Sequence, residues 1–188
     1  MPVENKTIGF TEATPTNLLI DAGAVWKNYG LTGEKLIGAT SGGNEFNVKI
    51  NFRQIKCDGV KGDAKGLKRI VSTEVSLKTN LLEVTTETLA MILLGQVDTT
   101  TDVDYDIITG KTTILDTDYL ENVAIVGTIS GSDKPVIIIV KNALSLDGLT
   151  VKTEDDGDNV LPCTFGGHID PNSPLDLPYE IKYPKAVV

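Results

Sequence analysis

Apolar and polar residues alternate along one long stretch of the chain, from Arg69 to Leu81. One side of this stretch carries Val71, Val75, Leu77 and Leu81, and the other carries Ser72, Glu74, Ser76, Lys78 and Asn80. Alternation of this kind is typical of a β-strand with one buried face. Because a slip of one residue would expose the whole apolar set, the pattern also specifies the register of the strand.

A short helix is predicted directly after this strand, over residues 85–95. Thr85 or Thr86 offers a side-chain oxygen for the N-cap, and Glu87 falls in the first turn, where the helix dipole favours negative charge. Apolar residues follow at helical spacing: Leu89, Ile92 and Leu93. Gly95 is expected to end the helix, because glycine adopts the left-handed conformation of a helix stop without strain.

The predicted helix has no charged face after Glu87. Ala90, Met91 and Leu94 fill the positions between the main apolar ones, whereas a surface helix of an isolated domain keeps a polar side. Two interpretations stay open: a helix buried within one domain, or a helix packed against a second subunit. The second interpretation makes candidate inter-subunit residues of Leu89, Met91, Ile92 and Leu94.

A second alternating segment runs from Asn44 to Lys56. Its apolar side carries Phe46, Val48, Ile50 and Phe52, and its polar side carries Asn47, Lys49, Asn51 and Arg53. The glycine-rich segment 57–66 joins it to the 69–81 strand, so the pair is expected to form a hairpin with a long polar loop. Loops of this length commonly make contacts. The charged candidates for such contacts are Asp58, Lys61, Asp63 and Lys65.

Further short strands are predicted along the rest of the chain, separated by turn residues. They cover residues 18–20, 24–26, 107–108, 112–115, 122–130, 135–146, 149–153, 160–169 and 179–183. The strands 107–108 and 112–115 are expected to turn at Gly110 and pair with each other. Many short strands with a single helix indicate a mainly β fold, a β-sandwich or open barrel with a flanking helix. We expect one domain over residues 1–188, with an N-terminal arm (1–17) and an extended, proline-rich C-terminal tail (171–188).

The composition limits the classes of function. The 188 residues carry a formal net charge of −9, and 5% of them are aromatic. An acidic chain repels the phosphate backbone, and few aromatic residues are available to stack on bases, so ordinary nucleic-acid binding is disfavoured. The first ten residues include Glu4 and Lys6 and no apolar run, and the longest apolar runs are too short to span a bilayer. We expect a soluble protein made in a cytoplasm.

Cysteine and histidine usage indicates no reactive centre. Cys57 and Cys163 lie far apart and fit no zinc or redox motif, so we expect free thiols, buried or half-buried. The single histidine, His168, has no nucleophile pattern nearby. The sequence Gly110-Lys111-Thr112 lacks the earlier glycine of a phosphate loop, because residue 105 is a tyrosine. We expect no enzymatic activity and no cofactor.

Two acidic segments resemble calcium loops in part. Asp102, Asp104 and Asp106 match the start of such a loop, but Ile107 and Thr113 occupy the positions of its glycine and glutamate. The acidic turn 154–159 has no better match. Both segments are expected to be solvated, and no metal is predicted.

Several segments of the first half resemble a known protein family. These are Asp21-Ala22-Gly23-Ala24-Val25-Trp26-Lys27-Asn28-Tyr29-Gly30, residues 36–46, Cys57-Asp58-Gly59-Val60-Lys61-Gly62, residues 67–70 and Asn80-Leu81-Leu82-Glu83-Val84-Thr85. They resemble the amino-terminal part of the major tail tube proteins of long-tailed phages and related prophages. From about Gln96 onward the chain shares strand character with that family and no recognisable motif.

The resemblance implies a structural virion protein with a sandwich or barrel fold and one flanking helix. Its copies would form rings, typically hexameric, that stack into a tube, and their strands would join into one barrel around a channel for DNA delivery into the host. The implied partners are further copies of the chain and other tail proteins (tape measure, tail terminator and distal tail). DNA would pass without binding, and no membrane is involved. The implied location is the phage tail, after assembly in the host bacterial cytoplasm.

The polar faces of the two hairpin strands are the expected lining of such a channel. The candidate lining residues are Asn47, Asn51, Ser72, Glu74 and Ser76. The alternative is that these faces form ordinary outer surface. A basic lining would trap DNA through phosphate contacts, and the net charge of −9 has the opposite sign. Lys49, Arg53 and Lys78 lie on the same faces and argue against a negative lining unless carboxylates pair with them. The loop 57–66 and both chain ends are candidate contacts between stacked rings.

A monomeric β-sandwich that serves as a binding or adhesion module is the alternative interpretation. Such modules usually expose aromatic residues that stack on sugars, and this chain offers Trp26 and a few tyrosines. Self-association distinguishes the two interpretations, because the module would remain monomeric.

Overall fold

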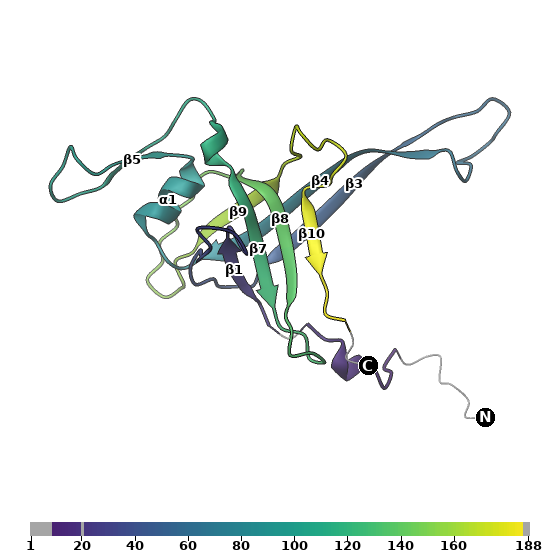
Figure 1. Ribbon diagram of the computed structural model, residues 1–188, viewed down its shortest axis with the longest axis horizontal. Helices are drawn as coiled ribbons and strands as arrows, with labels where there is room; N and C mark the ends of the chain where they lie inside the picture. Colours follow the sequence, from purple (N-terminus) through teal and green to yellow (C-terminus); the bar gives the residue numbers. More distant parts are fainter. Residues whose placement is uncertain (1–8, 20, 186–188) are drawn as a thin grey trace.

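A computed structural model describes residues 9–19 and 21–185, and the paired strands in this part of the chain are antiparallel (Figure 1). The strands are β1 (Ala24–Lys27), β2 (Lys35–Leu36), β3 (Glu45–Gln54), β4 (Lys68–Leu81), β5 (Gln96–Asp98), β6 (Ile107–Thr109), β7 (Leu120–Gly127), β8 (Val136–Ser145), β9 (Leu161–Gly167) and β10 (Tyr179–Lys182). The helical elements are α1 (Thr86–Leu93) and two 3-10 turns, η1 (Thr14–Thr16) and η2 (Asp116–Asp118). The predicted mainly β chain with one α-helix is confirmed, and the arrangement is compatible with a β-sandwich.

Eight strands form one sheet in the order β2-β1-β7-β8-β9-β4-β3, with β10 beside β8. Strand β8 pairs with β7 along one edge, while β10 and β9 share its other edge, at residues 137–140 and 143–145. The segment after β2 links the two ends of this order. Ile37 N donates to Val25 O, and further along Leu82 N donates to Ala39 O. The sheet therefore curves around a single core.

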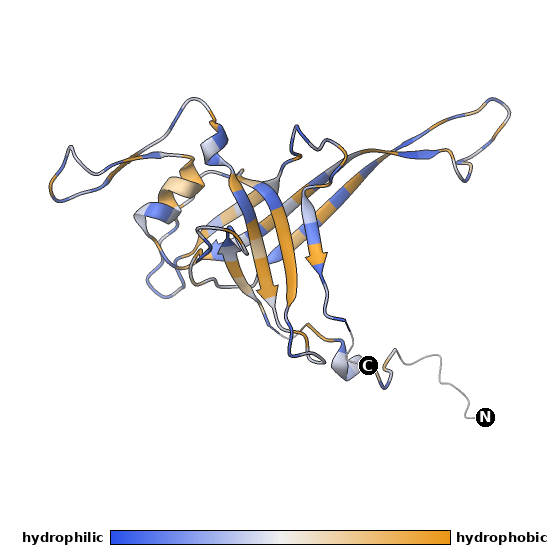
Figure 2. Cartoon of the chain, in the orientation of Figure 1, coloured by the Kyte–Doolittle hydropathy of each residue, from blue (hydrophilic) through white to orange (hydrophobic). Residues whose placement is uncertain are grey.

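The core lies inside this curved sheet. Its fully buried residues come from strands that are far apart in the order: Val25, Leu77, Leu81, Val123, Val140 and Phe165. Figure 2 shows the matching apolar stretches on β7, β8 and the inner part of the β3–β4 pair. Because residues of β1 and β4 contribute to one cluster, the two ends of the curved sheet cover each other's apolar faces.

The β3–β4 hairpin extends well beyond the core (Figure 1). Near its base the predicted alternation is confirmed, because Val75 and Leu77 are buried. The prediction is wrong for Val71, which is 64% exposed. Val71 lies on the part of the hairpin that extends past the core, where Phe52 and Ile70 are exposed as well. A β-bulge also occurs here: Asn51 lies opposite Ser72, but the next residue of β3, Phe52, lies opposite Ile70, which leaves Val71 as the extra residue.

The helix α1 begins as predicted and ends differently. Thr88 N donates to Thr85 Oγ1 (3.1 Å), and Thr85 N donates to Thr88 Oγ1 (2.9 Å), which forms a reciprocal cap. Leu94, with φ 50°, adopts the left-handed conformation that was predicted for Gly95. Gly95 is instead needed for space, because a Cβ at this position would lie 3.0 Å from the carbonyl oxygen of Thr109 in β6.

Three other predictions of local structure need correction. Residues 107–109 pair with β5 rather than with 112–115, and neither 112–115 nor 149–153 lies in a strand. The tail is not extended throughout, because turns interrupt it before β10: Ser173 N donates to Asp170 O, and Asp176 N donates to Ser173 O. Residues 1–8 of the predicted arm, residue 20 of a predicted strand and residues 186–188 of the tail lie outside the described residues.

Candidate interaction surfaces

The five candidate lining residues lie together on one face of the β3–β4 hairpin, away from the core. Asn47 lies opposite Ser76, and Asn51 lies opposite Ser72. The fifth residue, Glu74, lies opposite Lys49 on the same face. The structure therefore brings together all the residues that the alternation assigned to this polar face.

Hydrogen bonds and one ion pair connect these side chains. Asn51 Nδ2 donates to Glu74 Oε1 (2.7 Å) and to Ser72 Oγ (3.0 Å). Lys49 Nζ lies 3.3 Å from Glu74 Oε2. The hydrogen bond from Asn51, together with the nearby Lys49 ammonium, lowers the pKa of the Glu74 carboxyl. Glu74 therefore remains a carboxylate at neutral pH and balances the charge of Lys49.

The inner part of this polar face is electrically balanced. Lys49 is paired with Glu74, and Lys78 lies opposite Glu45 in the register. Of the basic residues that argued against a negative lining, Lys49 and Lys78 thus have a glutamate opposite them. Arg53 lies opposite Arg69, further out along the hairpin, where positive charge accumulates.

A shallow groove of about 550 Å³ runs beside this face, with Leu146, Gly166 and His168 on its far side. The side chain of Leu146 packs close over Gly166, since a Cβ on this glycine would lie 2.5 Å from Leu146 Cδ1. His168 packs edge-on against Tyr119, with ring centres 5.2 Å apart, and its Nδ1 lies 3.1 Å from Asn142 O. These contacts give His168 a packing role at the groove wall.

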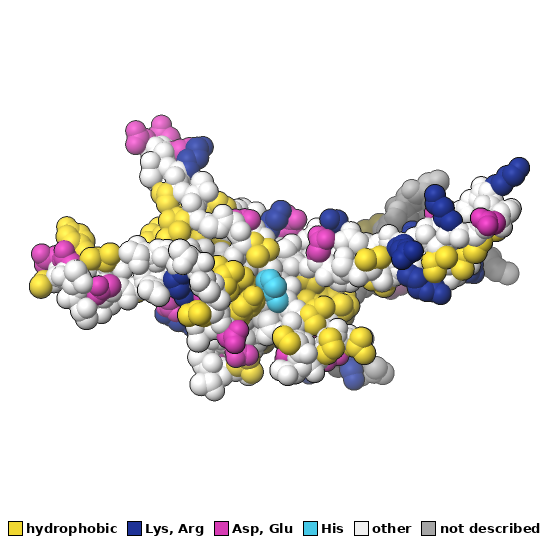
Figure 3. Space-filling model, turned by 90° about the horizontal axis from the view of Figure 1, so that it is seen from above, with side chains coloured by type: hydrophobic (Ala, Val, Ile, Leu, Met, Phe, Trp, Pro, Cys, Tyr) yellow, Lys and Arg dark blue, Asp and Glu magenta, His cyan; other side chains and the backbone are white. Residues whose placement is uncertain are grey.

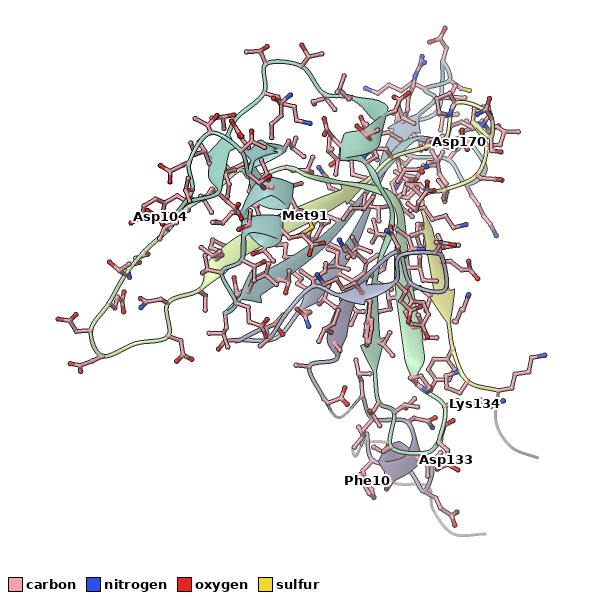
Figure 4. All side chains as sticks on the ribbon, turned by 60° about the vertical axis from the view of Figure 1, so that its left-hand side comes forward. Phe10, Met91, Asp104, Asp133, Lys134 and Asp170 are labelled. Carbon is pink, nitrogen blue, oxygen red and sulfur yellow. The ribbon has the colours of Figure 1, made fainter. Side chains whose placement is uncertain are left out.

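The candidate inter-subunit residues of α1 mostly face the chain's own core. Ile92 is 1% exposed, and Leu89 and Met91 pack against the core cluster. Figure 4 shows Met91 between α1 and the sheet. Leu94 is half-buried at the helix end. The structure thus supports the interpretation of a helix buried within one domain for Leu89, Met91 and Ile92.

Polar contacts also hold α1 against the sheet. Glu87 forms ion pairs with Lys27 and Lys35. The hydrogen bond from Lys27 lowers the pKa of the Glu87 carboxyl most, and the hydrogen bond from Lys35 lowers it next. At the other end of the helix, the buried Ser145 Oγ donates to Ile92 O (3.0 Å). Together these contacts attach both ends of the helix to strands of the main sheet.

The loop 57–66 forms the far end of the hairpin (Figure 1). All four charged candidates in it are exposed: Asp58, Lys61, Asp63 and Lys65. Cys57 is exposed as well, which corrects the expectation of a buried or half-buried thiol, whereas Cys163 is buried as expected. Burial raises the pKa of the Cys163 thiol to about 12.

An exposed apolar face on the outer hairpin was not predicted from the sequence. We refer to residues 50–71 as the distal hairpin. On it Phe52 and Ile70 are 53% and 63% exposed, and Ile50 and Val71 are exposed as well. The alternation of β3 continues unchanged past the core boundary, through Ile50 and Phe52, so its pattern alone gave no signal of where burial ends. The basic residues that cluster around the loop were the feature of the sequence that could have indicated an exposed surface here.

A second projection at the opposite end of the molecule is acidic (Figure 3). We refer to residues 98–107, which join β5 to β6, as the acidic loop. Asp98 accepts hydrogen bonds from Thr100 and Thr101, which lower the pKa of its carboxyl. Asp102 Oδ1 accepts from Asp104 N (2.8 Å) and from Tyr105 N (3.1 Å). Aspartates therefore shape the backbone of this loop.

Neither a protein-family model nor a curated protein matches the chain. In residues 9–19 and 21–185, no helix is long and apolar enough to cross a membrane. The same residues contain no group of three or more His, Cys, Asp or Glu side chains placed to hold a metal ion.

Proposed function

We propose that this chain is a structural subunit that self-associates into rings, and that the rings stack into a tube of the phage-tail type through which DNA passes. The observation that carries the proposal is the distal hairpin. It extends two strands past the core and exposes apolar residues such as Phe52 and Ile70. An exposed apolar face on a projecting element is typical of an association surface.

The edge of the sheet supports the same proposal. Strand β3 is last in the strand order, so its outer edge has no partner among the described strands. A long edge strand is a template for pairing with another chain, and natural proteins usually protect it. Closure of several copies into a ring would remove such edges, because every edge strand would meet a neighbour.

The balanced polar face fits the lining of a channel for DNA. Lys49 is matched by Glu74, and Lys78 lies opposite Glu45, so the inner face carries no excess of positive charge. Positive excess would hold the phosphates of passing DNA by releasing counterions. The side chains that remain are neutral amides and hydroxyls: Asn47, Asn51, Ser72 and Ser76. In this proposal the other partners are the remaining tail proteins, and the location is the virion.

Electron microscopy of the purified chain tests the proposal directly. We expect rings or tubes at high protein concentration, together with a large species in size-exclusion chromatography. A chain that stays monomeric at every concentration, also with the other tail proteins added, contradicts the proposal and favours a monomeric binding module.

A loop replacement separates ring formation from stacking. If residues 57–66 are replaced by a two-residue Asn-Gly turn, the hairpin can still close, and we expect rings without tubes. Shortening the exposed turn 154–158 in the same way provides the control and should leave tubes unchanged. Normal tubes from the variant with the shortened hairpin would reject a role of this loop in stacking.

A further inference from the structure

We infer that the acidic loop of one copy docks on the distal hairpin of the next copy, in a head-to-tail contact. The inference rests on the proposed self-association and names the two surfaces that meet. Both surfaces combine exposed apolar side chains with charge of a single predominant sign, and the two signs are opposite.

The distal hairpin supplies the basic and apolar surface. Residues 53–69 contain six basic and two acidic residues, a formal net charge of +4 within a chain of −9. The basic residues are Arg53, Lys56, Lys61, Lys65, Lys68 and Arg69. Arg53 and Arg69 adjoin the exposed Phe52 and Ile70 in the strands, and Lys68 Nζ lies 4.8 Å from the centre of the Phe52 ring. A partner must therefore offer apolar groups with acidic groups beside them.

The acidic loop has this composition. Residues 98–107 contain four aspartates and no lysine or arginine, a formal net charge of −4. Within Asp102-Val103-Asp104-Tyr105-Asp106-Ile107, aspartates alternate with apolar residues. Val103 is fully exposed, and Tyr105 is 74% exposed. The loop can thus place apolar side chains on the hairpin while its carboxylates meet the basic residues.

The two surfaces cannot meet within one copy. Figure 1 places β5 and its loop at one end of the longest axis and the β3–β4 hairpin at the other end. Figure 3 shows Asp and Glu side chains at the first end and Lys and Arg side chains along the second. A contact between them must therefore join different copies. Because the joined surfaces differ, the contact repeats from copy to copy, which produces a closed ring or an open filament.

A second copy accounts for more of the observations than a nucleic acid would. Phosphates could pair with the basic residues of the hairpin, but they offer nothing apolar to cover Phe52, Ile70 and Val71. A nucleic acid would also leave the acidic loop without a partner and would be repelled by it. One contact between copies covers both projections. Burial of apolar side chains would hold the two copies together, and the opposite charges would set their relative orientation.

A complementary charge reversal tests the inference. The first variant carries Arg53→Glu and Arg69→Glu in the hairpin, and the second carries Asp102→Lys and Asp104→Lys in the acidic loop, where Figure 4 labels Asp104. In each variant alone, like charges would face each other across the contact. We expect the protein concentration at which half of the chain is assembled to rise about tenfold or more. In an equal mixture of the two variants, opposite charges meet again, and assembly should return.

The control variant carries Lys134→Glu and Lys152→Glu, which gives the same change in net charge as the hairpin variant. Both lysines are exposed, and Lys134 lies in the loop between β7 and β8 (Figure 4). We expect the control to assemble as the unaltered chain does. Circular dichroism and thermal unfolding of the monomers establish that every variant folds.

Sedimentation velocity separates the outcomes. If the unaltered chain assembles, each reversal variant fails alone and their mixture assembles, the inference is supported. If the unaltered chain and both reversal variants assemble equally well, the inference is overturned while the proposed self-association stands. Variants that fail and are not rescued by mixing also overturn it, because the two surfaces then do not meet. An unaltered chain that never assembles overturns the proposed function, and the inference with it.

Discussion

Phe52 and Ile70 lie opposite each other across the β3–β4 hairpin, yet both side chains point to solvent rather than to the core. The β-bulge at Val71 creates this pair, because it shifts Ile70 to the face that carries Phe52. Cross-strand apolar pairs stabilise a sheet when a second layer covers them. Here no described layer of the same chain does so, and a neighbour is the expected cover.

Replacing this pair should affect assembly and spare the fold. For Phe52→Ser with Ile70→Ser we expect the free energy of unfolding to change by less than about 1 kcal/mol, because exposed positions contribute little to stability. Assembly should weaken clearly, since apolar contact area is lost. Urea unfolding and sedimentation velocity measure the two effects.

Leu77→Ala, in the same hairpin, is the matched control. Leu77 is fully buried in the core, so its truncation should destabilise the fold by about 2–5 kcal/mol. If the exposed pair destabilised the monomer as strongly as Leu77→Ala does, the distal hairpin would be part of the core, contrary to this account.

Ser145→Ala should loosen the attachment of α1. The hydroxyl of Ser145 donates to the carbonyl of Ile92, in the last turn of the helix, where carbonyl groups lack partners within the helix. Removal of the donor leaves this buried carbonyl unsatisfied, and we expect a loss of about 1–2 kcal/mol in unfolding free energy. Chemical unfolding measures the loss. The exposed Ser173 offers a control, because Ser173→Ala should change stability by less than about 0.5 kcal/mol.

The ion pairs of Glu87 predict a specific dependence of stability on pH. The pKa of Glu87 is lowered from 4.5 in the folded chain, so its contribution is present above this ordinary value and is lost as the pH falls through the lower, folded value. Glu87→Gln should therefore be less stable than the unaltered chain at pH 7, by about 0.5–1 kcal/mol for partly exposed pairs. In acid the two proteins should converge.

Thermal unfolding across this pH range measures the Glu87 effect. Glu121→Gln, an exposed site on β7 with the same change of charge, is the comparison. A constant difference between Glu87→Gln and the unaltered chain at all pH values would contradict a role of the ionised carboxylate.

The two cysteines should differ strongly in reactivity. Cys57 is exposed in the hairpin loop, whereas Cys163 is buried and the pKa of its thiol is raised to about 12. A thiol reagent should modify one cysteine in the native chain and both after denaturation, because the thiolate is the reactive form. Cys57→Ser should remove the fast reaction. Rapid modification of Cys163 in that variant would show that β9 opens readily.

Much of the local structure could be predicted because it depends on neighbours in the sequence. Alternation predicted β3, β4 and the faces of the hairpin, and it gathered the five candidate lining residues on one side. Capping chemistry at Thr85 predicted the start of α1, because the cap involves residues a few positions apart. The long hairpin loop was predicted for the same reason.

Predictions failed where the outcome depended on residues that are distant in the sequence. Val71 was expected in the core, but it lies on the part of the hairpin that extends past the core, and a local alternation does not show where the rest of the chain stops covering a strand. Residues 107–109 pair with β5 because the chain returns past α1, and not with the adjacent 112–115. Gly95 was assigned the left-handed position that Leu94 occupies, because the close approach of β6 was not foreseeable.

The sequence by itself determined the fold class of this protein. It predicted strands with alternating apolar and polar faces, one capped helix, and an acidic chain with a basic segment at 53–69. Those properties arise from backbone geometry and from charge, which residues carry wherever they end up. The tertiary structure decided which apolar faces are covered, because coverage depends on what packs against them. It buried Leu77 and exposed Phe52 on the same hairpin, and it set the basic and acidic projections at opposite ends of one molecule.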